Sequence, residues 1–286
     1  MDISDFSITV VGLGLIGGSF AASLKKLKPK NVWGIDVKKE TLDNAHKMGI
    51  IDKGYIDPEI PLNSSDIVII ALYPEDTVRF VKDNINYFKK GSIITDTTGV
   101  KRNVIKKIEL LLPDYIDFIG GHPMAGRESQ GLKMASEDMF VNSTYILTPS
   151  KKSKKKNIDI VSKMAKCIGC KNVVQMTPEE HDSIIAYVSH IPHVIAVSLL
   201  NSNIDDIDIS LFAAGSFKDA TRVASINCDL WTELFMSNKD NVIRFIDELE
   251  KNLSVIKDGL EKEDKNVIRE QLKSAKGIKE RNFSDV

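Results

Sequence analysis

Histidine and arginine side chains stand at places in this sequence where they can move a proton and hold an anion. His122 follows an apolar run, beside two glycines, in Gly121-His-Pro-Met-Ala-Gly126. Imidazole exchanges protons near neutral pH better than other side chains, so His122 is a candidate acid or base. Arg222 ends the segment that begins at Gly215, and a guanidinium is suited to bidentate capture of a carboxylate. These residue types indicate proton transfer on a small anion, although a packed histidine and a surface arginine are the plainer interpretations.

A second group of histidines lies in Ser189-His-Ile-Pro-His193. His190 and His193 are one helical turn apart, a spacing typical of metal ligands, but Pro192 distorts that geometry and no carboxylate or thiol completes a ligand set. We therefore expect no metal. Hydrogen bonding to a substrate is the favoured interpretation of this segment, and packing is the alternative.

A glycine-rich segment, Gly12-Leu-Gly14-Leu-Ile-Gly17, follows a β-rich run and opens a helical pattern. Asp36 ends the next apolar run, 19 residues after Gly17, which is the spacing of the dinucleotide-binding fingerprint. Gly12 permits the tight turn, Gly14 lets the backbone approach a pyrophosphate, and Gly17 lets the helix pack closely on the strand. This context predicts a bound dinucleotide rather than a glycine turn without a ligand.

Asp36 also indicates which dinucleotide binds. We expect its carboxylate to accept hydrogen bonds from the adenosine ribose and to repel a 2′-phosphate, which favours NAD over NADP. Lys38 and Lys39 follow directly and weaken that exclusion. The residues expected to contact the cofactor, from this loop and from later strand ends, are Gly12, Leu13, Gly14, Leu15, Ile16, Gly17, Asp36, Leu72, Tyr73, Pro74 and Thr97.

Alternating strands and helices must position these residues. Apolar runs separated by helical stretches occur at Ser7–Val11, Asn31–Asp36, Asp66–Leu72, Ser92–Asp96 and Asp117–Gly121. This alternation predicts an α/β fold with a Rossmann-type, doubly wound parallel sheet. Ligands of such sheets bind beyond the carboxyl ends of the strands, where the loops that carry His122 and Thr97 begin.

The pattern becomes helical from Thr177. Thr177-Pro-Glu-Glu180 is typical of a helix start, with an N-cap, a proline at N1 and a capping box. We expect an all-α helical domain over residues 176–286, after a Rossmann domain over residues 1–175. Its helices are predicted to extend to about residue 203 and over Leu230–Phe235, Asn241–Leu260 and Asn266–Lys279.

Composition excludes several classes of partner. The chain has 286 residues, 42% hydrophobic and 28% charged, which is typical of a globular protein. Lysine and arginine total 39 against 40 acidic residues, so no overall field attracts nucleic acid. The mean hydropathy of −0.13 and the lack of a continuous apolar run of about 20 residues predict no membrane span.

Cysteine content indicates a reduced compartment. The three cysteines are too few for a disulfide framework, and the acidic N-terminus is unlike a signal peptide, so we expect a cytoplasmic protein. Cys167 and Cys170 form a C-x-x-C that could be redox-active or half of a metal site. With Gly169 as a helix C-cap, we interpret both thiols as small buried side chains.

Taken together, these motifs resemble the prephenate/arogenate dehydrogenase family of tyrosine biosynthesis. The resemblance rests on the glycine loop, Asp96 to Lys101, Gly121-His-Pro-Met-Ala-Gly126, Met176-Thr-Pro-Glu-Glu-His-Asp182, Ser189-His-Ile-Pro-His193 and Gly215 to Arg222, in this order. It spans roughly residues 7 to 250. It implies oxidation of the C4 alcohol of prephenate by NAD(P)+ with loss of the ring carboxylate as CO2. It also implies a homodimer joined through the helical domain.

The resemblance assigns roles to individual residues. It implies that His122 receives the substrate proton, that Arg222 binds the ring carboxylate, and that His193 contacts the side-chain pyruvyl group. Ser189, His190 and Gly215 are expected nearby, with Glu128 as an acid that pairs with the arginine.

Gly99 departs from the family pattern. Many relatives carry a serine at this position, whose hydroxyl orients the catalytic histidine and the substrate oxygen. We expect Thr98, Thr97 or a water molecule to supply that group. If Thr98 supplies it, the change Thr98→Val costs activity but not NAD affinity.

Other functions stay open at this point. Arogenate is the alternative substrate, with an ammonium in place of the keto group, and His193 favours the keto acid. A β-hydroxyacid dehydrogenase or a pyrroline carboxylate reductase shares the architecture but typically relies on a lysine or other polar groups in the helical domain. A nucleotide-sensing protein without turnover needs neither His122 nor Arg222.

Overall fold

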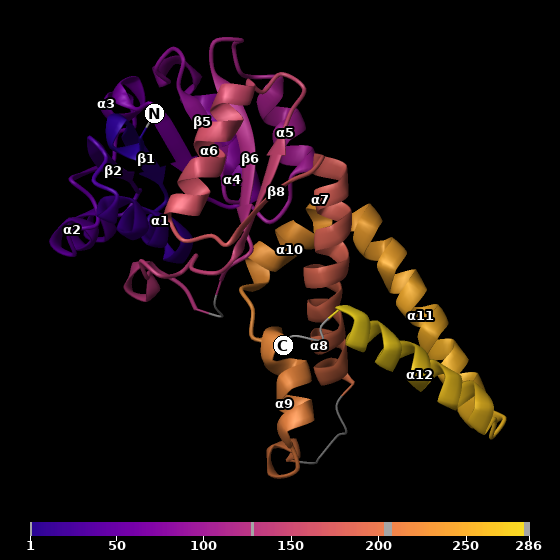
Figure 1. The fold of residues 1–286 in the computed structure, drawn as a ribbon. Coiled ribbons are helices and arrows are strands. Elements are labelled where there is room, and N and C mark those ends of the chain that lie inside the picture. Colours follow the sequence, from indigo (N-terminus) through magenta and orange to yellow (C-terminus); the bar gives the residue numbers. More distant parts are fainter. Residues whose placement is uncertain (1, 127–128, 203–207, 283–286) are drawn as a thin grey trace.

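An eight-stranded sheet forms the N-terminal part of the protein, in a computed structural model that describes residues 2–126, 129–202 and 208–282. Figure 1 shows this sheet with helices on both faces, and further helices extending from one end of it. The strands are β1 (Ser7–Val11), β2 (Asn31–Ile35), β3 (Lys53–Tyr55), β4 (Ile67–Ile70), β5 (Ile93–Asp96), β6 (Asp117–Pro123), β7 (Thr144–Pro149) and β8 (Asn172–Gln175). Their spatial order is β3-β2-β1-β4-β5-β6-β7-β8.

The sheet confirms the Rossmann-type prediction with one addition. In the spatial order β3-β2-β1-β4-β5-β6, all neighbouring strands pair in parallel, as expected. β7 runs antiparallel to β6, and β8 then pairs in parallel with β7. The five predicted strands are all parallel, and the antiparallel pair involves β7, a strand that the sequence pattern did not predict. Between β6 and β7 the described residues, 124–126 and 129–143, contain no α-helix, and an antiparallel neighbour needs no crossover helix.

Two hydrophobic cores cover the two faces of the sheet. Successive strand residues point to opposite faces, so in β1 the side chain of Val10 joins one core and that of Val11 joins the other. The first core packs against α1 (Leu15–Lys26), α2 (Lys39–Lys47) and α6 (Lys155–Cys167). The second packs against α3 (Glu59–Ser64), α4 (Pro74–Asp83) and α5 (Arg102–Glu109). Burial on both faces explains why the predicted central strands are nearly all apolar.

Short 3-10 helices complete the N-terminal part. They are η1 (Ile3–Asp5), η2 (Ile85–Tyr87) and η3 (Leu132–Met134), and η5 (Ile209–Leu211) and η6 (Arg222–Ala224) follow in the C-terminal part.

Helices make up the C-terminal part, as predicted. They are α7 (Pro178–Ile185), the π-helical turn η4 (Ala186–His190), α8 (Ile191–Asn201), α9 (Gly215–Thr221), α10 (Cys228–Ser237), α11 (Lys239–Glu261) and α12 (Lys265–Asn282). The predicted capping box is present: the Glu180 N–H donates to Thr177 Oγ1 (3.2 Å) and the Thr177 N–H donates to Glu180 Oε2 (2.8 Å). The helical part begins immediately after β8 ends.

The helices α7, η4 and α8 form one long apolar rod. Over Pro178–Asn201 it is long and apolar enough to cross a membrane by length and composition, with a window of mean hydropathy 1.7 that is 28% buried. The prediction that the chain has no such stretch is therefore wrong. The rod also carries buried polar side chains, His181, Asp182 and His190, which face other parts of the same chain.

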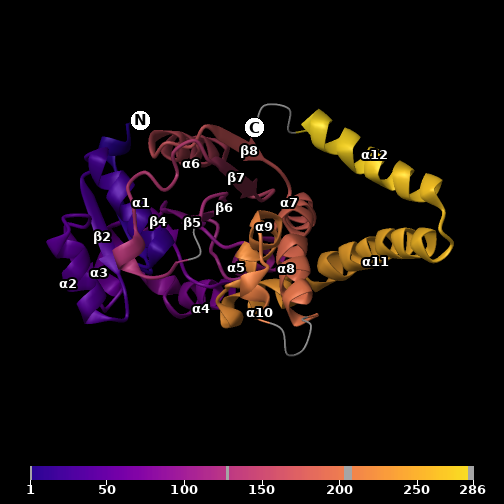
Figure 2. The same cartoon turned by 90° about the horizontal axis from the view of Figure 1, so that it is seen from below.

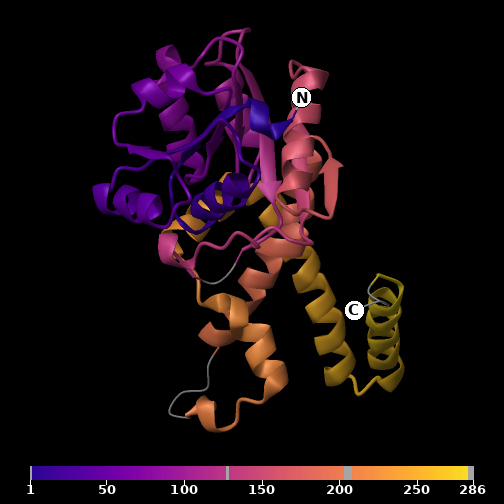
Figure 3. The ribbon, with the colours of Figure 1, turned by 60° about the vertical axis from the view of Figure 1, so that its left-hand side comes forward.

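The last two helices project from the rest of the molecule. Figures 1, 2 and 3 agree that α11 leads away from α7 and α8 and that α12 returns beside it as an antiparallel pair. Gly259 lies where a side chain would collide with Ile268, so its lack of one lets the two helices approach. Apolar side chains such as Leu253, Leu260 and Leu272 remain more than half exposed on this pair.

The C-x-x-C segment is only partly as expected. Gly169 follows α6 with a φ of +106°, a left-handed conformation that ends the helix, which confirms its role at the C-terminus. Cys170 is buried, as predicted, but Cys167 is exposed because it lies on the solvent side of the last turn. Both thiols are free.

Two glycines of the first loop allow a stability test with a matched control. A Cβ at Gly17 would lie 1.8 Å from the carbonyl oxygen of Gly12, whereas a Cβ at Gly14 would meet no atom within 4 Å. We expect Gly17→Ala to lower the free energy of unfolding by about 3 kcal/mol or more, because the backbone must move. Gly14→Ala is expected to cost about 1 kcal/mol or less. Denaturant titration of both variants measures the difference, and equal losses would contradict this packing argument.

Candidate active site

Three predicted functional loops meet at one edge of the sheet. The strands β1, β2, β4, β5 and β6 are parallel, so their carboxyl ends lie together. Gly12 follows β1, Thr97 follows β5, and His122 lies near the end of β6. The sheet therefore brings the glycine loop and His122 to the same edge, as the strand pattern predicted.

The glycine loop has the geometry that a phosphate group requires. Gly12 adopts a φ of +82°, and its N–H donates to the carbonyl of Ile35 (2.8 Å). Helix α1 starts after Gly14, which has no side chain to cap it, and among the described residues no side-chain hydrogen bond to the N–H groups of its first turn is present. Uncapped N–H groups and the helix dipole both favour an anion at this point. The loop therefore fits a dinucleotide pyrophosphate.

Asp36 lies at the end of β2, where its carboxylate holds the glycine loop. Its Oδ2 accepts from the N–H of Leu13 (2.9 Å) and its Oδ1 from the N–H of Lys38 (2.9 Å). The side chain is half-buried, so part of it still faces solvent. Asp36 therefore connects the loop to the next strand, in addition to the ribose contact predicted for it.

A buried ion pair lies behind the loop that follows β5. Lys101 and Asp96 are both inaccessible to solvent, and the Lys101 ammonium is bonded to the Asp96 carboxylate. The same ammonium donates to the carbonyl oxygen (2.9 Å) and to Oγ1 (2.9 Å) of Thr98. Burial lowers the pKa of Lys101, and the Asp96 charge opposes that shift. This cluster fixes the loop from Asp96 to Lys101.

Thr98 is placed differently from the sequence prediction. Its hydroxyl is bonded to the Asp96 carboxylate and to the carbonyl of Val100 (2.8 Å), and the side chain is 4% exposed. The Thr98 hydroxyl is therefore engaged inside the Asp96–Lys101 cluster. These contacts give Thr98 a structural role in the loop, and its catalytic part stays a prediction. Thr97 is half-buried and remains the predicted alternative at this loop.

His122 belongs to a chain of three hydrogen-bonded side chains, which we call the histidine relay (His122, His181 and Asp182). The Nδ1 of His122 lies 2.9 Å from the Nε2 of His181, and the Nδ1 of His181 lies 2.8 Å from Asp182 Oδ1. His181 and Asp182 open the helical part on α7, whereas His122 lies on β6. The relay therefore crosses from one domain to the other.

Asp182 is held by the start of α5. Its Oδ1 accepts from the N–H of Lys101 (2.7 Å) and its Oδ2 from the N–H of Arg102 (3.0 Å). The side-chain amide of Asn238, on the far side, donates to the Asp182 carbonyl (2.7 Å). These bonds lock α7 against the Rossmann domain and fix the orientation of His181.

Burial keeps the histidines of this region neutral. It lowers the pKa of His122 well below the usual range, and the neighbouring His181, Lys101 and His190 lower it further. Burial also lowers the pKa of His181, against the opposing effect of Asp182. The pKa of His190 falls to about 4, again mainly through burial. A neutral His122 is able to accept a proton.

His190 and His193 flank an aromatic ring. The π-helical turn η4 precedes Pro192, whose missing N–H interrupts the regular helix, and this turn sets the directions of both histidines. The His193 ring stacks on Trp231, with centroids 3.5 Å apart, and its Nδ1 donates to the carbonyl of Ser189 (2.8 Å). His190 is buried against the edge of the same tryptophan. His193 is thus the more accessible of the two.

The remaining predicted substrate residues are less closely placed. Arg222 is exposed on η6, which packs against α8, and Gly215 starts α9 in open space. Glu128 lies outside the described residues. The structure thus brings His122 close to His181 and His190, and places His193 beside Trp231, with Arg222 on a neighbouring element.

The loop after β4, which carries the predicted cofactor contacts Leu72, Tyr73 and Pro74, touches the helical part. Tyr73 is 38% exposed, and its hydroxyl accepts from the side-chain amide of Asn227 (3.0 Å). The N–H of Glu75 donates to a carboxylate oxygen of Glu233 (2.5 Å) on α10. Pro74 is buried at the first position of α4, and Leu72 is half-buried beneath it. These contacts bring the predicted cofactor and substrate elements together.

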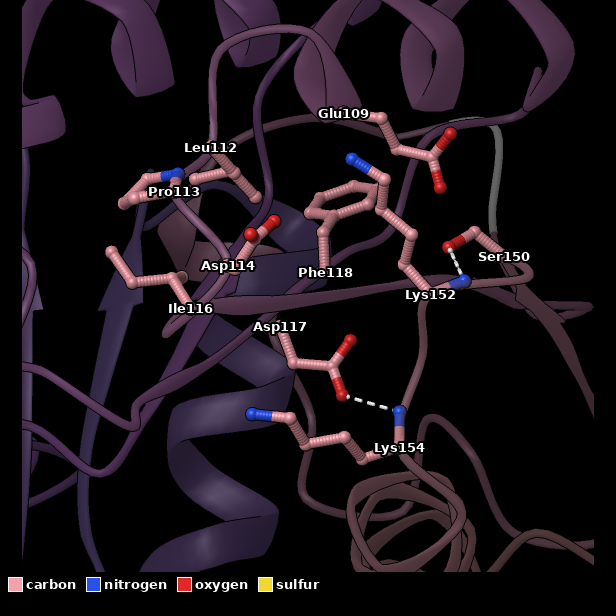
Figure 4. Close-up of a pocket in the computed structure, with 10 residues that line it drawn as sticks. All are labelled: Glu109, Leu112, Pro113, Asp114, Ile116, Asp117, Phe118, Ser150, Lys152 and Lys154. Carbon is pink, nitrogen blue, oxygen red and sulfur yellow. Dashed lines mark hydrogen bonds between the residues drawn. The ribbon is translucent and has the colours of Figure 1, made fainter.

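A cavity of about 300 Å³ lies elsewhere, at the opposite end of β6. Figure 4 shows the side chains around it, with Asp117 accepting from the Lys154 N–H and the Ser150 hydroxyl accepting from the Lys152 N–H. Asp117 opens β6 and His122 is five residues further, roughly 16 Å along an extended strand. This cavity is separate from the strand-end edge that carries the glycine loop and His122. Among the described residues, no group of three metal-ligating side chains is arranged to hold an ion.

Sequence reasoning did not assign His181, Asp182 or Lys101 to the site. The signal was present, because His181 and Asp182 stand in Met176-Thr-Pro-Glu-Glu-His-Asp182 and Lys101 ends the loop after β5. Their contacts with His122 and with α5 join residues 59 to 81 positions apart, and such pairs cannot be inferred from spacing.

Two protein-family models match the two parts of the chain. Residues 20–174 match the model described as the nucleotide-binding domain of prephenate dehydrogenase, and residues 177–274 match its dimerization domain. The chain belongs to the prephenate dehydrogenase family. The fold and the order of the two parts agree with the expectation drawn from the motifs.

Individual relatives support this result. The chain is 34% identical over 280 residues to a prephenate dehydrogenase of Bacillus subtilis, covering 96% of this chain and 75% of that one. A crystal structure of prephenate dehydrogenase from Aquifex aeolicus, in complex with hydroxyphenyl propionate and NAD+, is similar with a TM-score of 0.89 at 30% identity, covering 96% and 97%. The structure of Synechocystis arogenate dehydrogenase is similar with a TM-score of 0.84 at 25% identity, covering 96% and 99%.

The buried histidines predict how stability depends on pH. Each has a lower pKa in the folded protein than its unfolded value of about 6.5, so the unfolded chain binds more protons below that pH. The stabilisation is present above pH ~6.5 and is lost as the pH falls, by about 1.4 kcal/mol per pH unit for each histidine that stays neutral. Urea titrations at several pH values between 7.5 and 5 measure this slope.

His190→Gln is the control for that measurement. Its slope is expected to be shallower, because one neutral buried histidine is removed. Identical slopes for the two proteins would show that His190 titrates equally in the folded and unfolded states.

Proposed function

We propose that this chain is a prephenate dehydrogenase that oxidises prephenate with NAD+ and releases 4-hydroxyphenylpyruvate and CO2. The single observation that carries the proposal is the position of His122, at the strand-end edge that also holds the glycine loop, with its Nδ1 bonded to His181. That bond leaves the Nε2 of His122 for a substrate hydroxyl. Family membership supplies the class of substrate.

The chemistry needs few groups. The bound dinucleotide supplies a nicotinamide that accepts hydride from C4 of the ring. His122 accepts the proton of the C4 hydroxyl at Nε2 as the carbonyl forms. The resulting dienone is vinylogous to a β-keto acid, so loss of the ring carboxylate gives an aromatic phenol without a further catalyst. The protein therefore has to bind, align and receive one proton.

Substrate binding is assigned to the helical part. In this proposal Arg222 pairs with the ring carboxylate and His193 contacts the side-chain keto group, with Ser189, His190 and Gly215 nearby. The stacking of His193 on Trp231 supports its part, because a stacked ring is held in one orientation. Glu128 keeps its predicted role as the acid that pairs with the arginine.

NAD is proposed as the cofactor in preference to NADP. The Asp36 carboxylate at the end of β2 is half-exposed, and a 2′-phosphate placed beside it would be repelled. The Aquifex aeolicus relative was crystallised with NAD+, which agrees with this preference. Arogenate is the second candidate substrate, since the Synechocystis relative is an arogenate dehydrogenase.

A steady-state assay tests the proposal. Absorbance of the reduced cofactor is followed with prephenate or arogenate and with NAD+ or NADP+. We expect prephenate and NAD+ to give the highest kcat/KM, and His122→Asn to lower kcat by about 100-fold or more, because a proton acceptor is lost. Turnover of neither substrate by folded protein would favour a nucleotide-sensing protein instead.

We also propose a homodimer joined through the helical part, in a cytoplasmic enzyme. The long rod of α7, η4 and α8 carries exposed apolar side chains at helical spacing, Ile184, Tyr187, Val188, Ile195 and Leu199. A second copy covering this face would remove apolar surface that a monomer leaves in water. The family model over residues 177–274 is described as a dimerization domain.

Sedimentation equilibrium tests the dimer. We expect a mass of twice 31.8 kDa for the natural chain and a shift toward 31.8 kDa for Leu199→Asp, since a buried charge opposes association. Leu110→Asp is the matched control, because Leu110 is 81% exposed on the Rossmann domain. A natural chain that stays monomeric at micromolar concentration would exclude this interface.

A further inference from the structure

The two inner members of the histidine relay have no assigned part in the reaction. We propose that His181 stores the proton that leaves the substrate hydroxyl, acting through His122, with Asp182 as its counter-ion. This inference rests on the proposed function, because it concerns the fate of the proton that His122 accepts. It goes further because His122 then only transfers the proton, and His181 is the residue that holds it.

Donor and acceptor chemistry sets the starting state of the relay. Asp182 already accepts from two backbone N–H groups and, as a carboxylate, has no proton to give, so the Nδ1 of His181 must carry a hydrogen. A neutral His181 then has a lone pair on Nε2. His122 must therefore donate from Nδ1 across the 2.9 Å contact, and its Nε2 is the acceptor. The relay selects the one tautomer of His122 that can receive a proton from the cleft.

Proton transfer through the relay balances in two steps. First the O–H bond of the C4 hydroxyl breaks and a bond forms between its proton and His122 Nε2. Then the Nδ1–H bond of His122 breaks and the same hydrogen bonds to His181 Nε2. His122 ends neutral, as the other tautomer, and His181 ends as an imidazolium beside the Asp182 carboxylate. One positive charge has moved away from the ring being oxidised, and no other reactant is needed.

The charged neighbours favour the proton on His181. Asp182 contacts His181 directly at 2.8 Å, whereas among the described residues the titratable groups that act on His122 are His181, Lys101 and His190, which all disfavour a positive charge there. His181 also faces Lys101 and Asp96, whose charges oppose each other. Burial lowers the pKa of both histidines, but Asp182 and Asp96 partly oppose that shift at His181, and no described acid opposes it at His122.

Burial prevents solvent from competing with the relay. His181 is 0% exposed and Asp182 is 1% exposed, whereas His122 is half-buried at the strand-end edge of the sheet. A proton on His181 can therefore return only through His122, after the product leaves and the cleft admits water. The arrangement keeps the charge inside the protein during hydride transfer and decarboxylation.

Two substitutions at position 181 separate proton storage from positioning. In His181→Gln, the amide reaches the place of Nε2, so its oxygen can accept from His122 Nδ1 and keep the tautomer, but it cannot be protonated. In His181→Asn, the shorter amide reaches the place of Nδ1 and keeps the Asp182 bond instead, so His122 loses its partner. Dissociation constants for NAD+ measured by fluorescence titration, together with melting temperatures, check that both variants fold.

The expected result is a loss in kcat without a loss in binding. We expect His181→Gln to lower the single-turnover rate of reduced-cofactor formation by roughly 10- to 100-fold, with KM for prephenate within about twofold, and His181→Asn to lower it further. In mixtures of H2O and D2O, the rate of the natural enzyme should fall along a curve, because two protons move. That of His181→Gln should fall along a straight line, because only one does.

Other results would overturn the proposal. A His181→Gln rate equal to that of the natural enzyme would mean that His181 only positions His122. A raised KM for prephenate with kcat unchanged in His181→Gln would mean that His181 and His122 only shape the substrate-binding region. Natural enzyme that turns over neither substrate would instead contradict the proposed function, so the two failures can be distinguished.

Discussion

The hydrogen bonds of the Asp182 carboxylate are the interactions on which the rest of the site depends. The carboxylate belongs to α7, yet it accepts the N–H groups of Lys101 and Arg102 at the start of α5. Unpaired N–H groups and the helix dipole make the start of a helix a favourable place for a negative charge. The same carboxylate orients His181, and through it His122. One side chain thus joins the two domains and, through His181, sets the orientation of His122 between them.

The buried pair of Lys101 and Asp96 has a related function. A buried ion pair contributes little net stability, because both charges lose their hydration, but it holds its surroundings in one geometry when all its hydrogen bonds are made. Here the ammonium binds both the carboxylate and Thr98, and the N–H of Gly121 donates to the other carboxylate oxygen (3.1 Å). The loop after β5 and the strand that carries His122 are therefore held by the same charge.

Strand and helix patterns in the sequence predicted most of the fold. The central strands are four to seven residues long, apolar and followed by turns or loops, so their period and their turns were visible without a structure. β3 has only three residues, and β7 is paired antiparallel to β6 after a long connection whose described residues form no α-helix. Short or returning strands lack a distinctive local pattern, because their pairing partners decide that they are strands.

Local chemistry therefore determined what the sequence alone could establish: the glycine turn, Asp36 at the next strand end, the capping box at Thr177 and a histidine at the end of β6. Each depends on residues a few positions apart or on one strand and its loop. Tertiary structure alone decided that Thr98 turns into the Asp96–Lys101 cluster, that Cys167 is exposed, and that His181 meets His122. These outcomes depend on which distant backbone and side-chain groups satisfy each polar atom once it is buried, and that is settled only when the two domains pack together.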